Sequence, residues 1–259
     1  MQSFLLAALL YAAPPEMPKG HLVAVGGGTT TPAIVKKTLD LAGGAKVRML
    51  IIPQSSAAAD AGSSSAKFWR ENGAENIQVL TFDDKNKAVN AVIEAELIWM
   101  PGGDQNPLMK ALTDTGVPEA IRKRYLAGAT VGGTSAGAAV LSGVMLTGDA
   151  NLGIIRAGNT KTADGLSLWP TAIVDQHFVK RQRFNRLLSA VMDRPELVGI
   201  GIDEGTAAVL TGHRFEVVGT GQVVVVDARQ GKVTPPAGIR DVRLHVLSEG
   251  MSFDMTPVK

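Results

Sequence analysis

Short apolar segments alternate with segments of helical periodicity through the first half of this chain, and no other feature limits its fold as strongly. The expected strands are 21–25, 46–52, 77–80, 97–100 and 130–132. The expected helices are 32–41, 57–72, 87–95 and 119–126, with a further helix after Ser135. Because strands that alternate with helices favour a parallel sheet covered by helices, we expect an α/β fold.

The pattern changes after about residue 200, where short apolar runs are separated by turns that contain glycine. These runs are 207–210, 214–218, 223–227 and 242–247. They predict a β-rich C-terminal part that extends the sheet with antiparallel strands. A chain of 259 residues accommodates one large domain or two small ones. Since no long linker interrupts it, we interpret 21–259 as a single α/β domain.

Residues 1–20 precede this domain and contain an apolar run. Residues 4–11 are apolar, and Ala12, Ala13 and a proline-rich stretch follow them, as in a secretory signal peptide with its cleavage site. No lysine or arginine precedes Lys19, so the basic start of such a signal is missing. We expect export to the periplasm or beyond, and the alternative is a cytoplasmic protein with a disordered apolar N-terminus. The run is too short to anchor the chain in a membrane.

Composition argues against several classes of function. The 26 basic and 24 acidic residues leave a net charge of +2, too little to favour nucleic acid or an anionic membrane as a partner. The absence of cysteine excludes disulfides, thiolate metal sites and a cysteine nucleophile. The four histidines have no metal-ligand spacing, and the glycines at 26–28 lack the rest of a dinucleotide-binding fingerprint. We therefore expect neither a metal nor a cofactor, and we expect these glycines to let the backbone approach the active site.

Residues 133–137, Gly-Thr-Ser-Ala-Gly, form a G-x-S-x-G motif between an expected strand and an expected helix. In hydrolases this motif exposes the serine on a sharp turn whose crowding requires glycine neighbours. We interpret Ser135 as a nucleophile, the alternative being a glycine-rich turn in which it caps the helix. The Ala136 N–H is then the expected first donor of an oxyanion hole, and Gly103, after strand 97–100, is the candidate for the second.

A serine nucleophile needs a base, and His177 is the best placed of the four histidines because it follows the apolar run 172–174 and precedes a basic helix. An acid must in turn orient the base. Asp203 and Glu204 follow another apolar run, and Asp149 is a third candidate. We expect one of Asp203 and Glu204 to hold the imidazole and the other to brace the turn.

Three blocks of this sequence resemble the cyanophycinases, which belong to the serine peptidase family that also contains aspartyl dipeptidase. The blocks are 133–137, 175–178 with the three arginines that follow, and 201–204, and residues 102–105 resemble a fourth. The resemblance covers most of 21–230 and includes the spacings between the blocks. It implies a fold like the class I glutamine amidotransferases, a three-layer α/β sandwich with a mostly parallel sheet, usually assembled as a homodimer.

The resemblance also implies a triad of Ser135, His177 and Glu204. The activity that it implies is exopeptidase hydrolysis, through an acyl-enzyme, of cyanophycin, a poly-aspartate that carries arginine on each side chain, to β-aspartyl-arginine dipeptides. The substrate-pocket positions that it implies are Gln105, Asp175, Gln176, Arg181, Arg183 and Arg186. Arginines suit the free α-carboxylate that a β-linked aspartyl residue carries beside the scissile bond. Because helical spacing cannot place all three arginines on one face, we expect one or two of them in the pocket.

Other functions stay open at this stage. Within the same family, an aspartyl or isoaspartyl dipeptidase is the nearest alternative. A serine esterase with the order serine, acid, histidine would have to use His245, which lies inside an expected strand. The fold could also serve a binding protein without catalysis. For the arginine of the substrate, Asp104 and Asp175 are the acids near enough to the other blocks to consider.

Overall fold

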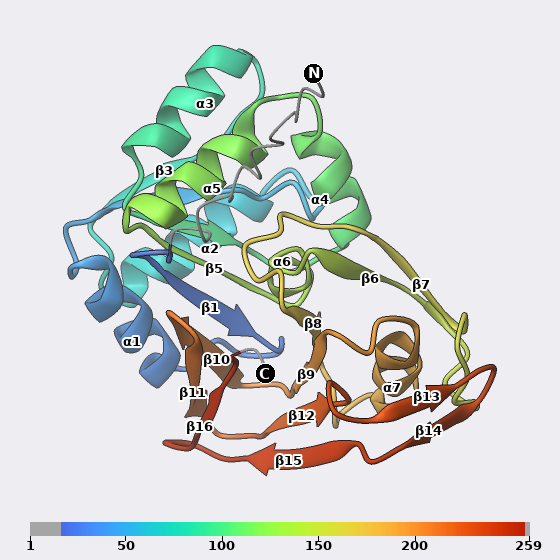
Figure 1. The fold of residues 1–259 in the computed structure, drawn as a ribbon. Helices are drawn as coiled ribbons and strands as arrows, with labels where there is room; N and C mark the ends of the chain where they lie inside the picture. Colours follow the sequence, from blue (N-terminus) through green and yellow to red (C-terminus); the bar gives the residue numbers. More distant parts are fainter. Residues whose placement is uncertain (1–16, 257–259) are drawn as a thin grey trace, which may run out of the picture.

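The largest β-sheet organises the molecule, of which the computed structural model describes residues 17–256 (Figure 1). It has eight strands in the order β16-β11-β10-β1-β5-β4-β2-β3. They are β1 (His21–Val25), β2 (Arg48–Ile51), β3 (Asn76–Val79), β4 (Leu97–Met100), β5 (Thr130–Thr134), β10 (Thr206–Thr211), β11 (Arg214–Gly219) and β16 (Ser252–Asp254). Strands β1 to β5 pair in parallel, and β10, β11 and β16 continue from β1 with antiparallel pairing.

Helices cover both faces of this sheet because its central strands are apolar on both. The helices are α1 (Pro32–Ala42), α2 (Ala61–Glu71), α3 (Lys85–Glu94), α4 (Gln105–Leu112), α5 (Val117–Ala127) and α6 (Ala136–Ala139). Successive strand residues face opposite sides, so Leu22 of β1 joins the core beneath α3, α5 and α6, whereas Val23 joins the core beneath α1 and α2. The three-layer α/β architecture expected from the sequence is therefore confirmed.

A second sheet of four strands packs against one face of the first. Its order is β15-β12-β9-β8, with β8 (Ala172–Asp175), β9 (Val198–Ile202), β12 (Val223–Asp227) and β15 (Arg243–Leu247). One side of β12 faces the core of the large sheet, and the other side packs beneath α7 (Phe184–Asp193). The prediction that all late strands extend the first sheet was thus wrong for β12 and β15. Because β12 is apolar on both faces, it needs cover on both sides, which a separate sheet between two layers provides.

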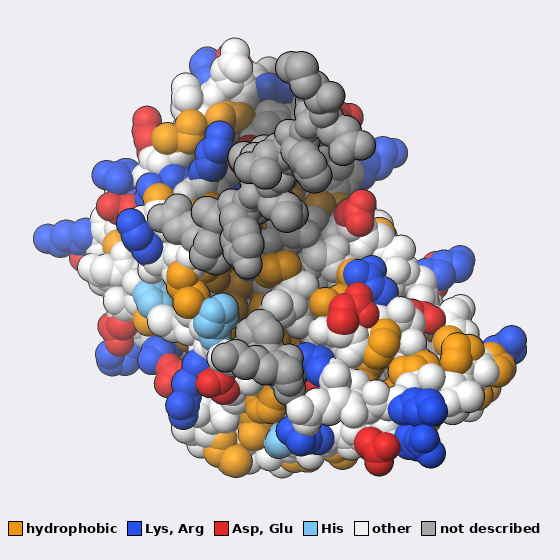
Figure 2. Space-filling model, in the orientation of Figure 1, with side chains coloured by type: hydrophobic (Ala, Val, Ile, Leu, Met, Phe, Trp, Pro, Cys, Tyr) orange, Lys and Arg blue, Asp and Glu red, His pale blue; other side chains and the backbone are white. Residues whose placement is uncertain are grey.

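Two β-ribbons that the sequence did not predict complete the described structure. They are β6 (Val144–Ala150) with β7 (Thr160–Asp164), and β13 (Lys232–Thr234) with β14 (Gly238–Arg240). On the face drawn in Figure 2, the basic and acidic side chains of the described residues are interspersed. None of the helices between residues 17 and 256 is long and apolar enough to cross a membrane. The run interpreted as an export signal falls in residues 1–16, outside the described residues.

Candidate active site

Ser135 lies on a tight turn between β5 and α6, at the carboxyl end of the central strands. Its backbone angles, φ 52° and ψ −108°, are rare for a residue with a side chain. A Cβ added to Gly133 would come within 2.5 Å of the Met100 carbonyl oxygen, and one added to Gly137 within 1.9 Å of the same atom. The Ser135 N–H donates to the Val25 carbonyl over 2.9 Å. The motif glycines are therefore required because the turn packs directly on the ends of β1 and β4.

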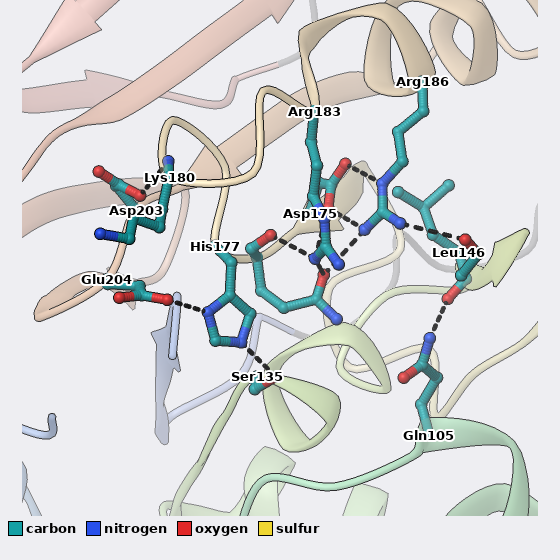
Figure 3. A network of polar contacts seen from close by, with 12 residues as sticks. Gln105, Ser135, Leu146, Asp175, His177, Lys180, Arg183, Arg186, Asp203 and Glu204 are labelled. Atoms are coloured by element: carbon teal, nitrogen blue, oxygen red, sulfur yellow. Dashed lines mark hydrogen bonds and ion pairs between the residues drawn. The ribbon is translucent and has the colours of Figure 1, made fainter. Parts of the chain in front are cut away.

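His177 follows β8 and brings its imidazole to the serine. Its Nε2 lies 2.9 Å from Ser135 Oγ (Figure 3). The backbone of His177 has φ 48°, and its N–H donates to the Gly26 carbonyl over 2.6 Å. A Cβ added to Gly27 would lie 2.3 Å from the imidazole Cε1. The run of three glycines after β1 thus lets the backbone approach the imidazole closely, as the sequence predicted.

Asp203 and Glu204, two consecutive acids that follow β9, bind different groups. Glu204 Oε1 lies 2.6 Å from His177 Nδ1, whereas Asp203 Oδ1 accepts from the Lys180 N–H over 3.0 Å (Figure 3). One carboxylate therefore contacts the imidazole and the other holds the backbone of the loop that carries it, as expected. The third candidate acid, Asp149, lies instead in an exposed ion pair with Lys161, with its Oδ2 3.4 Å from Nζ.

The surroundings of His177 keep it in the form that a base requires. Burial lowers its pKa below the ordinary value of 6.5, and the charges of Arg181 and Arg183 lower it further, against the opposing effect of Glu204. The hydrogen bond with His177 lowers the pKa of Glu204. At neutral pH the imidazole is therefore neutral beside an ionised carboxylate. In the tautomer that this favours, Nδ1–H donates to Glu204 and Nε2 accepts the hydroxyl proton of Ser135.

The two residues predicted to form an oxyanion hole, Gly103 and Ala136, both lie near the serine. Ala136 opens α6, where the first N–H groups have no partner within the helix. Gly103 lies in the turn after β4, and a Cβ added to its neighbour Gly102 would touch Ser135 Cβ at 3.5 Å. Within residues 17–256, neither the Ala136 N–H nor the Gly103 N–H donates a hydrogen bond to another group. Both remain available to a substrate oxygen.

A buried cluster of charge lies next to His177, at the end of β8 and the start of α7. Asp175 is fully buried, and Arg186 binds both of its oxygens, with Nε 2.7 Å from Oδ2 and Nη2 bound to Oδ1 (Figure 3). Arg183 Nη1 lies 3.8 Å from Asp175 Oδ1 and donates to the Gln176 carbonyl over 2.6 Å. Burial and the charge of Arg186 lower the pKa of Arg183 to about 10. Two guanidinium groups thus share one carboxylate, which leaves one positive charge unmatched.

The remaining pocket candidates lie around this cluster. Gln176 Oε1 accepts from Arg183 and Arg186, both over 3.2 Å. Gln105, in the first turn of α4, is buried and donates to the Leu146 carbonyl over 2.8 Å. Arg181 is exposed. The prediction of one basic helix directly after His177 was wrong, because α7 begins only at Phe184 and an irregular turn precedes it. Arg183 precedes α7 directly and Arg186 lies in its first turn, so the two residues are three positions apart and reach the same carboxylate.

Comparison with known proteins places this geometry in a family. The family described as Peptidase family S51 matches residues 22–218. The chain belongs to peptidase family S51. It is therefore a serine peptidase, in agreement with the resemblance found in its sequence. The cyanophycinase of Nostoc sp. is 34% identical over an alignment 260 positions long, which covers 93% of this chain and 87% of that protein. The cyanophycinase of Geminocystis herdmanii is 38% identical over 237 residues, which cover 85% of this chain and 87% of that protein.

Solved structures share the fold of this S51 peptidase. A peptidase from an acI-B1 actinobacterium superposes with a TM-score of 0.67 at 24% identity, over 92% of this chain and 98% of that one. A putative peptidase E protein from Listeria monocytogenes superposes with a TM-score of 0.59 at 17% identity, over 78% of this chain and 99% of that one. At these identities the likeness shows the α/β fold alone.

The alternative histidine of an esterase lies elsewhere in this S51 peptidase. His245 is on β15, where its ring packs against Phe253 with 5.1 Å between ring centroids, whereas Ser135 bonds His177. The geometry therefore gives the esterase hypothesis no support. Among residues 17–256, no group of three or more histidine and acidic side chains could hold a metal ion.

Gly201, beside the site, opens the sequence block 201–204 but was assigned no role from the sequence. Gly201 lies within β9, and a Cβ there would come within 2.5 Å of the ring of Phe178, the residue after His177. A glycine inside an apolar strand was the available signal, because such glycines often mark the close approach of another group.

Proposed function

We propose that this S51 peptidase cleaves cyanophycin from its chain end and releases β-aspartyl-arginine dipeptides. The observation that most supports the substrate is the pair Arg183 and Arg186 on the single carboxylate of Asp175, next to His177. Each arginine of cyanophycin is joined to the aspartate side chain through its α-amine and presents a free α-carboxylate, and a partly unmatched guanidinium binds a carboxylate strongly. Similarity to cyanophycinases over most of the chain supports the same substrate class.

The reaction that we propose proceeds through an acyl-enzyme. His177 accepts the proton of Ser135 as Oγ attacks the scissile carbonyl carbon, and the oxygen that becomes negative binds the N–H groups of Gly103 and Ala136. His177 then donates the proton to the leaving amine. Water then attacks the carbonyl carbon of the ester while His177 accepts a proton from the water. His177 donates this proton to Ser135 Oγ as the bond between Oγ and the acyl carbon breaks. Glu204 holds the imidazole in the tautomer that both steps need.

The test is to incubate purified protein with cyanophycin and to follow dipeptide release by mass spectrometry. We expect the wild type to release β-aspartyl-arginine and Ser135→Ala to lose about four orders of magnitude or more in rate, as when the serine of a triad is removed. The matched control is Ser142→Ala, since this serine is also buried but its hydroxyl, among residues 17–256, hydrogen-bonds only the Val174 N–H. A folded wild type that leaves cyanophycin intact yet cleaves β-aspartyl dipeptides would instead assign the isoaspartyl dipeptidase activity.

A further inference from the structure

Ser55 lies outside every motif of the sequence, yet it contacts the turn that carries Gly103. It follows β2 and is only 3% exposed. Its Oγ lies 2.9 Å from the carbonyl oxygens of both Pro101 and Gly102, and its own carbonyl accepts from the Asp104 N–H over 2.7 Å. A hydroxyl has one proton, which it donates to one of these carbonyls at a time or shares between them. Ser55 therefore holds the turn 101–104 through both its side chain and its backbone.

The contact with Ser55 determines which way the Gly103 N–H points, because the carbonyl and the N–H belong to the same Gly102–Gly103 peptide. The peptide is trans and planar, so the Gly102 carbonyl and the Gly103 N–H point opposite ways. A carbonyl held toward Ser55 therefore directs the Gly103 N–H away from Ser55. The nucleophile lies beside this turn, because a Cβ on Gly102 would touch Ser135 Cβ at 3.5 Å.

The Gly102–Gly103 peptide keeps one orientation only if another residue holds it by a hydrogen bond. Both of its residues are glycine, so rotation of the whole peptide meets little steric resistance. Glycine is nonetheless required at 103, which has φ 145° and where a Cβ would lie 2.1 Å from the Ser55 carbonyl oxygen. The turn thus combines close packing with low intrinsic rigidity. An oxyanion donor is effective only when it already points at the position where charge develops.

We infer that Ser55 is a positioning residue, whose hydroxyl directs the Gly103 N–H toward the oxyanion that forms on Ser135. The inference rests on the proposed function only in that Gly103 acts as an oxyanion donor, and it is independent of the substrate. Without the hydroxyl, the Gly102 carbonyl loses its donor and the peptide is free to rotate. The Gly103 N–H then points at the oxyanion for only part of the time.

The test uses a serine-directed phosphonate, whose P–O oxygen occupies the oxyanion hole as Ser135 is modified, and separates kinact from KI. We expect Ser55→Ala to lower kinact by about tenfold or more, short of the ~10²–10³-fold that removal of an oxyanion donor costs. KI, which reports binding of the phosphonate, should stay unchanged. The acid limb of the pH profile of kinact, which reports the protonation of His177, should also stay unchanged. Ser55→Cys, nearly isosteric but a weak donor, should lie between wild type and Ser55→Ala. Thermal unfolding verifies that each variant is folded.

Ser56→Ala is the matched control, because in the described part of the chain the Ser56 hydroxyl hydrogen-bonds only the Ala58 N–H of its own loop, over 3.2 Å. It should react like the wild type. A wild-type kinact in Ser55→Ala, or a shifted acid limb, would overturn the inference. If the wild type reacts with the phosphonate but leaves cyanophycin intact, the substrate proposal fails while the Ser55 variants still decide the inference. If wild-type Ser135 does not react at all, the site and the inference fall together.

Discussion

Glycines, which leave room where a side chain would stand, shape this site as much as its functional side chains do. Gly27 and Gly44 share a φ of 105°, but a Cβ on Gly27 would overlap the His177 ring, whereas one on Gly44 meets nothing within 4 Å. We therefore expect Gly44→Ala to cost only the backbone strain, about 1–3 kcal/mol, and to leave kcat unchanged. Gly27→Ala carries the same strain but also displaces the imidazole, and it should lower kcat by about 100-fold.

Steady-state kinetics and urea unfolding of both glycine variants check this prediction. The difference in kcat between them isolates the contact with the ring, because the backbone angle is the same. Equal kcat values for Gly27→Ala and Gly44→Ala would contradict the prediction, because they would show that a Cβ at position 27 does not displace the imidazole.

Glu204 controls both the orientation and the protonation of His177. The wild type should lose activity below pH 6.5, because catalysis needs neutral His177 and the net effect of its surroundings is to lower its pKa. Glu204 opposes that lowering, so Glu204→Gln should move the acid limb of kcat/KM to still lower pH. Its plateau should fall by about 10²–10⁴-fold, because the amide no longer fixes the productive tautomer.

The pH profile of kcat/KM for wild type and Glu204→Gln is the measurement here. Asp203→Asn is the comparison, since its side-chain oxygen can still accept from the Lys180 N–H and its carboxylate does not touch the ring. A limb that moves to higher pH in Glu204→Gln would contradict the assignment of Glu204 as partner of His177.

The residue pattern alone identified the groups at the site but not which of two neighbouring acids contacts the imidazole, and only the resemblance to cyanophycinases implied Glu204. Ser135 and His177 could be proposed from strand ends and the G-x-S-x-G motif. Asp203 and Glu204 have the same chemistry, and only the turn after β9 determines which of them reaches Nδ1. Ser55 gave no signal at all, because its role depends on the contact of two loops that are far apart in the sequence.

At the scale of elements, one buried ion pair joins β8 to α7. Arg186 and Asp175 are almost fully buried and pair through two hydrogen bonds, whereas Arg183 keeps a longer contact with the same carboxylate. Removing one partner of a buried pair leaves a charge without compensation. We expect Arg186→Met to destabilise the protein by about 3–5 kcal/mol. Arg183→Met should cost clearly less stability but raise KM for a substrate with a free α-carboxylate.

Urea unfolding and Michaelis–Menten kinetics separate these two arginines. The double variant Asp175→Asn with Arg186→Met removes both charges and should recover part of the lost stability. If Arg183→Met proves as destabilising as Arg186→Met and leaves KM unchanged, Arg183 is structural, and the support it gives to the substrate proposal disappears.

Most elements could be predicted from periodicity, and the errors have a common cause. Strands 97–100 and 223–227 were predicted at their observed bounds, and α1 and α5 differ by two residues or fewer at each end. Periodicity reports which faces of a strand are apolar, but not which sheet the strand joins. The valines of β12 therefore fitted an extension of the first sheet as well as a second one. In the ribbon β6–β7, the apolar run of β6 is limited to residues 144–146 and β7 is mostly polar and exposed, so the apolar pattern was too short to recognise.

For the molecule as a whole, the pKa values of two histidines set the dependence of stability on pH. Burial lowers the pKa of His21, which bonds Thr211 between β1 and β10, and burial also lowers that of His177. As pH falls through about 6.5, the unfolded chain therefore takes up protons before the folded one does. The free energy of unfolding should decrease over this range, and it should level off once both histidines are protonated in the folded state.

Urea unfolding at several pH values between 5 and 8 measures this slope. His21→Gln removes one of the two groups, lies away from Ser135 and should flatten the slope in part without changing kcat. His213→Gln serves as the control, because it replaces a histidine outside the proposed site. The prediction fails if the free energy of unfolding stays constant, or rises, as pH falls through 6.5. Such a result would mean that the folded protein does not lower the pKa of either imidazole. If the prediction holds, the same burial that makes His177 a base near neutral pH also makes the fold less stable in acid.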